Sequence, residues 1–338
     1  MLVSIQILRA LAAIMVVAYH CGLGPADLGN AANNNVLAAG VDIFFVISGF
    51  VMMVSTSKRS PSFPAFMSAR ILRIVPPYWI ATAIMCAVLI AHGRYPPAHE
   101  VILSLLFIPY TSSLDGRMNP VLVPGWTLDY EMFFYLLFGL TLRFGRPRQL
   151  CLLAAVFALL VCLRPLLGHL GAAGFRYTSP LLFEFFGGAV LGAFLKPRKA
   201  GPGGLLLILA GCLSGLALSL LLPRIPRIID FGIPAILIVA GSVMSEAYLG
   251  KAPVGFLVFL GNASYSIYLL HSFGIEAAAR IPLVPDAGRK IAGLLFGTVA
   301  GIAGYLVLER PVLRLLKQMQ GDFFLRGKAA LVRQPNAD

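Results

Sequence analysis

Long apolar runs alternate with short polar segments along almost the whole chain. A helix that crosses the hydrocarbon core of a bilayer needs about 20 mostly apolar residues, within a range of about 17–25. Ten runs fit that length, and each predicts a spanning helix. They lie at about residues 4–22, 37–55, 76–92, 127–143, 149–167, 180–195, 204–222, 228–246, 262–280 and 290–309. The pattern therefore predicts an all-α fold, a polytopic integral membrane protein with about ten transmembrane helices.

Two further features predict the domain organisation. The apolar run 101–110 is too short to span, and Pro109 and the polar residues after it end it, so we interpret it as a re-entrant or interfacial segment. No linker separates a second soluble domain. We therefore predict a membrane-embedded domain over residues 1–316 and a cytoplasmic C-terminal tail over residues 317–338.

The composition supports a bilayer as the solvent. Of 338 residues, 59% are hydrophobic and 12% are charged, about half the charged share of a soluble domain. A soluble chain of this size could not bury so much apolar surface in one core. The first apolar run follows almost directly from Met1, without a charged segment or a small-residue cleavage site. We interpret it as a signal anchor rather than a cleaved signal peptide.

The net charge of +13 arises mainly from lysines and arginines in short loops. One set of alternate loops, together with the C-terminal tail, holds 17 of them, the other set holds 9, and Arg9 lies inside the first helix. Because lysine and arginine collect in cytoplasmic loops, both termini are predicted to be cytoplasmic. No base-reading motif or basic stripe interleaved with aromatics is present, so no nucleic-acid partner is expected.

The five cysteines also indicate no special chemistry. All lie in or beside apolar segments, with no CxxC pair and no histidine at ligand spacing. We interpret them as small apolar side chains packed in helices, and we expect neither a disulfide nor a metal site.

Ionisable residues inside a spanning helix are costly, and each is a candidate functional residue. Arg9 and His20 are eleven residues apart in the first helix, about three turns, so they share one face about 16 Å apart along the axis. His20 would lie toward the outer surface. An imidazole in a desolvated pocket suits a general base, although a histidine satisfied by a neighbouring helix fits equally well.

The second helix reads GVDIFFVISGF and places Asp42 near its outer end, at a depth similar to that of His20. A carboxylate that accepts the second ring N–H of a histidine fixes its tautomer and stabilises the imidazolium. We therefore predict a His20–Asp42 dyad. In the alternative interpretation, Asp42 is a residue of the helix N-terminus, stabilised by the helix dipole.

A pair of arginines follows on the cytoplasmic side. Arg70 and Arg73 stand one helical turn apart in RILRIVPPYW. Two guanidinium groups bind phosphate oxygens well, so the pair could hold a phosphorylated donor. Ordinary cytoplasmic positive charge explains the same spacing.

Later helices add candidate pocket residues. Glu131, in PGWTLDYEMFFYLLF, needs a partner or a polar cavity at its depth. Tyr265 and His271 belong to a polar stripe in NASYSIYLLH, which fits either a substrate-facing wall or hydrogen bonds between helices. Glu309 and Arg310 are expected to form a local pair at the end of the last helix.

Several of these motifs together resemble one known family. The Arg9–His20 spacing, GVDIFFVISGF, the arginine pair before PPYW, WTLDYEMFFY, SYSIYLLH and the closing ERP stand in the order found in the acyltransferase 3 family, from the first helix to about Leu316. The resemblance implies about ten helices in a bacterial inner (cytoplasmic) membrane. It also implies an acyl-CoA donor, usually acetyl-CoA, and a sugar hydroxyl as acceptor, in an O-antigen, exopolysaccharide, peptidoglycan or nodulation-type oligosaccharide. By the same resemblance, His20 is the catalytic histidine, Arg9 its essential partner, and the arginine pair lies near the coenzyme.

One departure from the family is that some members carry a fused extracytoplasmic hydrolase-like domain, which is not expected here. The protein would then finish the transfer alone or with a separate extracytoplasmic partner. The predicted topology also places the two arginines inside and His20 outside, so a polar path between them is expected. Two rival interpretations remain: a transporter or flippase of a lipid-linked saccharide, and a structural subunit of an envelope assembly complex.

Overall fold

The computed structural model describes residues 2–23, 36–57, 61–196, 202–222, 225–250, 252–282 and 285–315, and these residues contain helices but no strand. The longer helices are α1 (Val3–His20), α2 (Ala39–Thr56), α3 (Phe63–Ala91), α5 (Trp126–Thr141), α6 (Arg146–Cys162), α9 (Leu182–Phe194), α10 (Gly203–Leu221), α11 (Ile233–Met244), α13 (Gly255–Ala279) and α14 (Asp286–Gly304). Shorter helices are α4 (Ala98–Leu105), α7 (Arg164–Leu167), α8 (Ala172–Tyr177) and α12 (Glu246–Leu249). The predicted tail lies outside the described residues.

Each predicted spanning segment falls on one of these helices. Among the described residues, six helical segments are long and apolar enough to cross a membrane: Val3–His20, Val36–Thr56, Phe63–Ala91, Gly203–Leu221, Gly255–Ala279 and Asp286–Leu315. Helices α5, α6, α9 and α11 coincide with predicted spans but have only 12 to 17 residues each. The helical content and the long apolar segments identify a membrane protein.

Two boundaries differ from the prediction. Helix α3 begins at Phe63 rather than near residue 76, because Pro76 and Pro77 lie inside it instead of starting it. The segment predicted at 149–167 is divided between α6 and α7 at Leu163. The short apolar run predicted as re-entrant or interfacial forms the end of α4 and the irregular chain that follows it.

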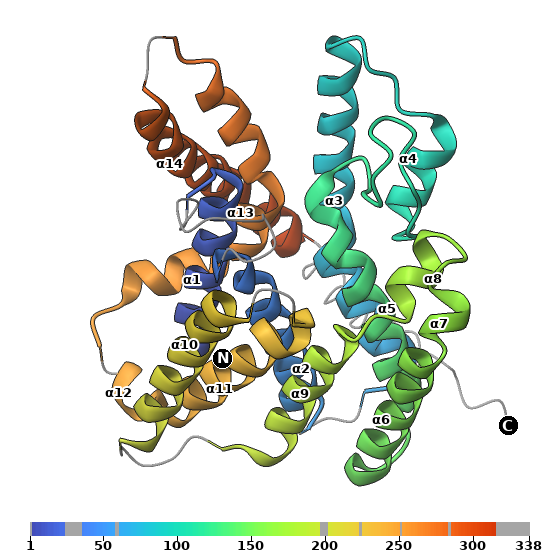
Figure 1. The fold of residues 1–338 in the computed structure, drawn as a ribbon, viewed down its shortest axis with the longest axis vertical. Helices are drawn as coiled ribbons and strands as arrows, with labels where there is room; N and C mark the ends of the chain where they lie inside the picture. Colours follow the sequence, from blue (N-terminus) through green and yellow to red (C-terminus); the bar gives the residue numbers. More distant parts are fainter. Residues whose placement is uncertain are drawn as a thin grey trace, which may run out of the picture.

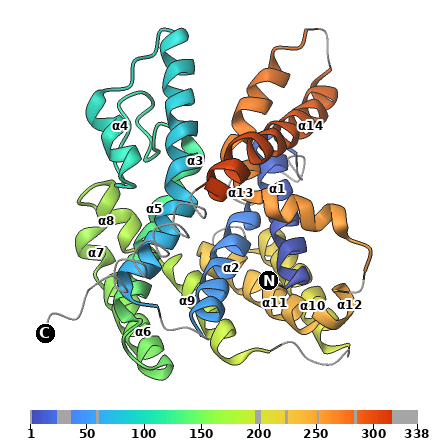
Figure 2. The same ribbon diagram turned by 180° about the vertical axis from the view of Figure 1, so that it is seen from behind.

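The helices form two groups with α2 and α9 between them (Figures 1 and 2). Helix α1 contacts α13, which lies along α14, while α3 and α5 contact each other in the other group. Stacked aromatic rings fill the core where α2, α5 and α9 meet. The ring centroid of Phe185 is 4.5 Å from that of Phe45 and 4.7 Å from that of Phe134.

Helices α2 and α9 approach closely enough that their backbones touch. A methyl group at Gly188 would lie 1.9 Å from the carbonyl oxygen of Val46, and one at Gly49 would lie 1.9 Å from that of Phe185. Small residues allow such close contact between helices in a bilayer, where dispersion forces hold helices together. The crossing fixes the position of α2, and the other face of α2 lines the central cavity.

We expect Gly188→Ala to lower the free energy of unfolding by about 1–3 kcal/mol, because the added methyl group must push α9 away from α2. The measurement is the thermal unfolding midpoint of the purified protein in detergent. Gly255→Ala is the matched control, since nothing lies within 4 Å of the added Cβ there. Equal midpoints for the two variants would contradict the close crossing.

The last helix widens where it meets the centre of the bundle. Helix α14 continues through a π-helical turn, η4 (Tyr305–Glu309), and then to Leu315. A π-helical turn inserts an extra residue per turn and changes which side chains face inward. Here both Tyr305 and Glu309 line the central cavity.

Candidate active site

A cavity of about 540 Å³ lies between the two groups of helices. Its walls come from α1, α2, α3, α5, α13, η4 and the turn that follows η4. The volume is within the range of sites for small molecules and cofactors, about 300–1,000 Å³. Polar and apolar side chains both contribute to the lining, so the cavity can take a ligand that has one charged and one apolar part.

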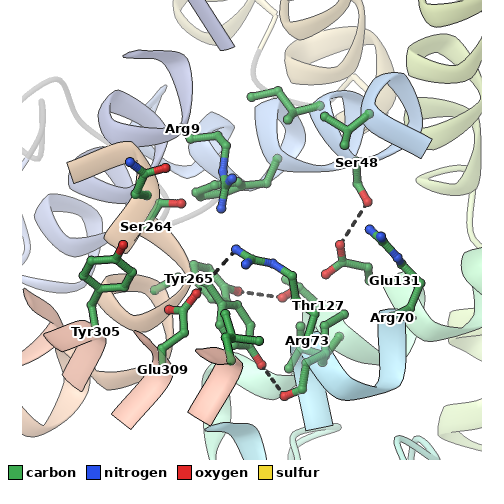
Figure 3. Close-up of a pocket in the computed structure, with 18 of the residues that line it drawn as sticks. Arg9, Ser48, Arg70, Arg73, Thr127, Glu131, Ser264, Tyr265, Tyr305 and Glu309 are labelled. Carbon is green, nitrogen blue, oxygen red and sulfur yellow. Dashed lines mark hydrogen bonds and ion pairs between the residues drawn. The ribbon is translucent and has the colours of Figure 1, made fainter. Parts of the chain in front are cut away.

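The cavity is strongly basic. Five arginines line it, against two carboxylates, Glu131 and Glu309. The arginines are Arg9 from α1, Arg70 and Arg73 from α3, and Arg310 and Arg314 from the end of the last helix. In Figure 3, Arg9 points into the cavity from the side opposite Arg73. The excess of three positive charges over negative ones favours an anionic ligand.

Arg70 and Arg73 differ in how they are held. A guanidinium nitrogen of Arg73 lies 3.4 Å from Oε1 of Glu309, which is fully buried, and Ser266 donates a 2.7 Å hydrogen bond to Oε2 of the same carboxylate. Arg70 has no ion pair with a described residue, and its Nε is buried without a hydrogen-bond partner among them. Arg70 is therefore free to bind an anion from the cavity.

The pair predicted between Glu309 and Arg310 is wrong. Glu309 reaches across to Arg73 on α3 instead, while Arg310 lines the cavity. Adjacent residues on a helix point about 100° apart and do not face each other. The sequence predicts Arg310 as the partner of Glu309 and Arg314 only as cytoplasmic charge, but both arginines line the cavity.

Glu131 lies in the polar wall formed by α2 and α5. Ser48 donates a 2.9 Å hydrogen bond to its carboxylate (Figure 3). Tyr135 donates a second, short hydrogen bond to the same carboxylate. Tyr265 from α13 donates to the backbone oxygen of Ile74, one residue after Arg73. Both predicted pocket residues, Glu131 and Tyr265, thus line the cavity together with the predicted arginine pair and Arg9.

The lining on α13 ends at Tyr268. The hydroxyl of Thr127 donates a 2.9 Å hydrogen bond to that of Tyr268, and the Tyr268 ring contacts Phe44 edge to face at 5.9 Å. Phe45 and Leu128 also belong to the apolar part of the lining. This end of the cavity is therefore suited to an uncharged, apolar group.

His20 and His271 lie beyond the cavity, not in its wall. His20 is exposed at the end of α1, beside a small hollow lined by residues of α13 and α14. Its ring centroid is 4.8 Å from that of His271, which is buried one helical turn beyond Tyr268. His271, predicted as a pocket residue, does not line this cavity, because three residues of helix carry it about 4.5 Å past Tyr268, the last lining residue on α13.

The polar path expected from Arg73 to His20 is also interrupted. Arg9 and His20 occupy one helix, as predicted, but only Arg9 reaches the cavity. Between the cavity and His20 stand the Tyr268 and Phe44 side chains and the ring of His271. In this structure the cavity and the small hollow beside His20 are separate.

Asp42 does not orient His20 in this structure. Its two carboxylate oxygens accept hydrogen bonds from Arg227 at 3.0 and 2.7 Å, and Asp42 is fully buried. The Nδ1 of His20 instead lies 2.9 Å from the backbone oxygen of Val16, one turn back on α1. The predicted dyad is therefore replaced by two separate contacts, because a buried carboxylate pairs preferentially with a guanidinium.

Among the described residues, no three His, Cys, Asp or Glu side chains come together in an arrangement that could hold a metal ion. The five cysteines are free thiols, at partly buried or exposed positions. The residues that the site does bring together suit binding of a phosphorylated ligand and, at the end of α1, proton transfer by an imidazole.

The fold and the site define a helical membrane protein with a basic central cavity and a histidine pair beyond it. The chain belongs to the acyltransferase 3 family, whose model, described as an acyltransferase domain, matches residues 2–310. It is therefore an acyltransferase that transfers groups other than aminoacyl groups. No solved structure matches the chain with significance.

Two curated proteins extend the comparison. The chain is 38% identical over 301 residues to the exopolysaccharide production protein ExoZ of Rhizobium meliloti, covering 87% of this chain and 95% of that protein. It is also 24% identical over 348 residues to BcsY of Komagataeibacter xylinus, whose name proposes a membrane-bound transacylase. That match covers 96% of this chain and 86% of BcsY.

Proposed function

We propose that the protein transfers an acyl group, acetyl in the simplest case, from acyl-CoA to a hydroxyl of an exopolysaccharide, with His20 as the general base. The likeness to ExoZ, whose name refers to exopolysaccharide production, supports a carbohydrate acceptor. We place the protein in the bacterial inner membrane, with about ten spans and both termini in the cytoplasm. The distribution of loop charges supports that orientation.

The observation that carries the proposal is the basic cavity. Coenzyme A has three phosphates, and five arginines against two carboxylates supply the complementary charge. Arg70 is the first anchor, since no described carboxylate competes for it. The apolar end beside Phe44 and Tyr268 would take the acyl group and its thioester. A transporter or flippase of a lipid-linked saccharide would instead move its substrate without consuming CoA.

The tautomer of His20 suits a general base. A backbone carbonyl can only accept a hydrogen bond, so the contact with Val16 places the proton on Nδ1 and leaves Nε2 with a lone pair. Nε2 takes the proton of the acceptor hydroxyl as its oxygen bonds to the acyl carbon and the carbon–sulfur bond breaks. The proton then passes to the departing thiolate, which gives an ester and free CoA.

The acyl group must pass from the cavity to His20 during this reaction. The Tyr268 ring and its hydrogen bond to Thr127 lie on that route, together with Phe44. We propose that binding of the pantetheine arm displaces these side chains.

The test measures ester-bound acyl groups on the exopolysaccharide of cells that lack this protein and carry wild-type protein or His20→Ala. We expect His20→Ala to lower the acyl content by at least about 100-fold, the usual contribution of general base catalysis. His99→Ala, an exposed histidine on α4, is the control and should restore the ester. Membrane abundance is matched by immunoblot, and full restoration by His20→Ala would exclude His20 as the base.

A further inference from the structure

His271 is a buried imidazole with an unused acceptor. It is 1% exposed, and its Nδ1 lies 2.7 Å from the backbone oxygen of Tyr268. Because the carbonyl accepts, Nδ1 carries the proton and Nε2 carries the lone pair. Nε2 is buried with no hydrogen-bond partner among the described residues. A buried acceptor without a partner is destabilising, and an apolar side chain at this position would avoid that cost.

The ring that holds this acceptor faces the proposed base. The centroids of His271 and His20 are 4.8 Å apart, with the ring planes inclined at 49°. Each imidazole is fixed by its own helix, His20 through Val16 on α1 and His271 through Tyr268 on α13. The contact between the rings therefore joins two rigid helices at the end of α1.

Among the described residues, the other charged groups that line the hollow beside His20 come from α14. Asp286, Arg289 and Lys290 line the same small hollow as His20. Lys290 and Asp286 form an ion pair with each other at 3.3 Å. Tyr19 contacts the His20 ring edge to face from α1 itself, at 5.1 Å. Of the two described rings in contact with that of His20, the ring of His271 carries a buried, unused lone pair.

We propose that His271 is the positioning residue of the base. Its neutral ring holds His20 in place, and its Nε2 lone pair stabilises the positive charge that His20 acquires when it takes the proton of the acceptor hydroxyl. In other histidine bases a carboxylate that accepts the second ring N–H stabilises this charge, as the sequence predicted for Asp42. In this protein the backbone oxygen of Val16 accepts that N–H, so the lone pair of His271 acts as a separate, uncharged source of stabilisation. The inference rests on the proposed function, since it requires His20 to act as the base.

The consequence is specific to the chemical step. His271 lies outside the cavity, so its loss should leave the binding of the donor unchanged. Stabilisation of charge that develops only in the transition state raises kcat without changing KM. If His271 had only a structural role, its substitution would instead lower the amount of folded protein.

The experiment uses inverted membrane vesicles from cells that make the exopolysaccharide, with radiolabelled acetyl-CoA as the donor. Incorporation of label into glycan is measured for wild type, His20→Ala, His271→Phe and His271→Gln. Phenylalanine keeps the ring and removes the lone pair, whereas glutamine restores an acceptor oxygen without a ring. Ser272→Ala, next to His271 on α13, is the matched control, and all rates are divided by the amount of protein.

We expect His271→Phe to lower kcat by about tenfold to a hundredfold with an unchanged KM for acetyl-CoA. His271→Gln should have a kcat clearly above that of His271→Phe and within about tenfold of the wild-type value. Ser272→Ala should have the wild-type kcat. If His20→Ala abolishes incorporation while His271→Phe keeps the wild-type kcat, the inference is overturned and the proposed function stands. Equal loss in the Phe and Gln variants at normal abundance would also overturn it. Activity in His20→Ala would instead refute the proposed base.

Discussion

Arg227→Leu is expected to lower the free energy of unfolding by about 3 kcal/mol, because it leaves the Asp42 carboxylate buried without its cation. Breaking a buried pair by removing one partner costs about 3–5 kcal/mol. The lower value applies because the Arg227 side chain is 35% exposed. Asp42, at 0% exposed, has no access to water that could replace the two lost hydrogen bonds. The measurement is thermal unfolding of the purified protein, with membrane abundance as a second readout.

The double variant Arg227→Leu/Asp42→Asn should recover most of this loss, because it removes the buried charge together with its partner. Arg280→Leu is the control. It removes an arginine from an ion pair with Glu276, in which both side chains are more than half exposed, and such pairs contribute at most about 1 kcal/mol. An Arg227→Leu protein as stable as Arg280→Leu would refute the structural role of Asp42. A stable but inactive Asp42→Asn protein would favour a catalytic role for Asp42.

The apolar pattern predicted the helices well, because a bilayer imposes a minimum length on any spanning segment. It could not predict that α3 continues through Pro76 and Pro77, since proline usually ends a helix in water. It also could not predict the π-helical turn at Tyr305–Glu309, which depends on contacts of α14 with the rest of the bundle.

The physical cost of placing polar groups in a bilayer also predicted part of the candidate site. The cost of a charge at membrane depth indicated that Arg9 and Glu131 matter, and both line the cavity. That cost does not reveal which partner a charge has. Asp42 pairs with Arg227, 185 residues away in the sequence, and only the fold brings the two together. His271 followed the helical stripe of Ser264 and Tyr268, but periodicity does not show where along the helix a cavity ends.

Arg70→Glu is expected to raise the KM for acetyl-CoA by about 100-fold or more with little change in the amount of folded protein. A charge-assisted hydrogen bond contributes about 1.5–3 kcal/mol, and a carboxylate at this position would also repel the donor phosphates. Arg70 is a better position than Arg73 for this test of donor binding, because Arg73 also neutralises the buried Glu309. The Arg70 guanidinium instead lies 5.9 Å from the Phe66 ring centroid and pairs with no described carboxylate.

Arg143→Glu is the control for this charge reversal. Arg143 is exposed outside the cavity, and its guanidinium also lies over an aromatic ring, that of Phe144 at 4.9 Å. Incorporation of label from acetyl-CoA into glycan is measured over a range of donor concentrations in the same vesicles. A rise in KM for Arg70→Glu alone places the donor phosphates in the cavity, since both variants change the net charge equally. An unchanged KM would mean that the donor binds elsewhere, and a fall in kcat alone would move Arg70 from binding to the chemical step.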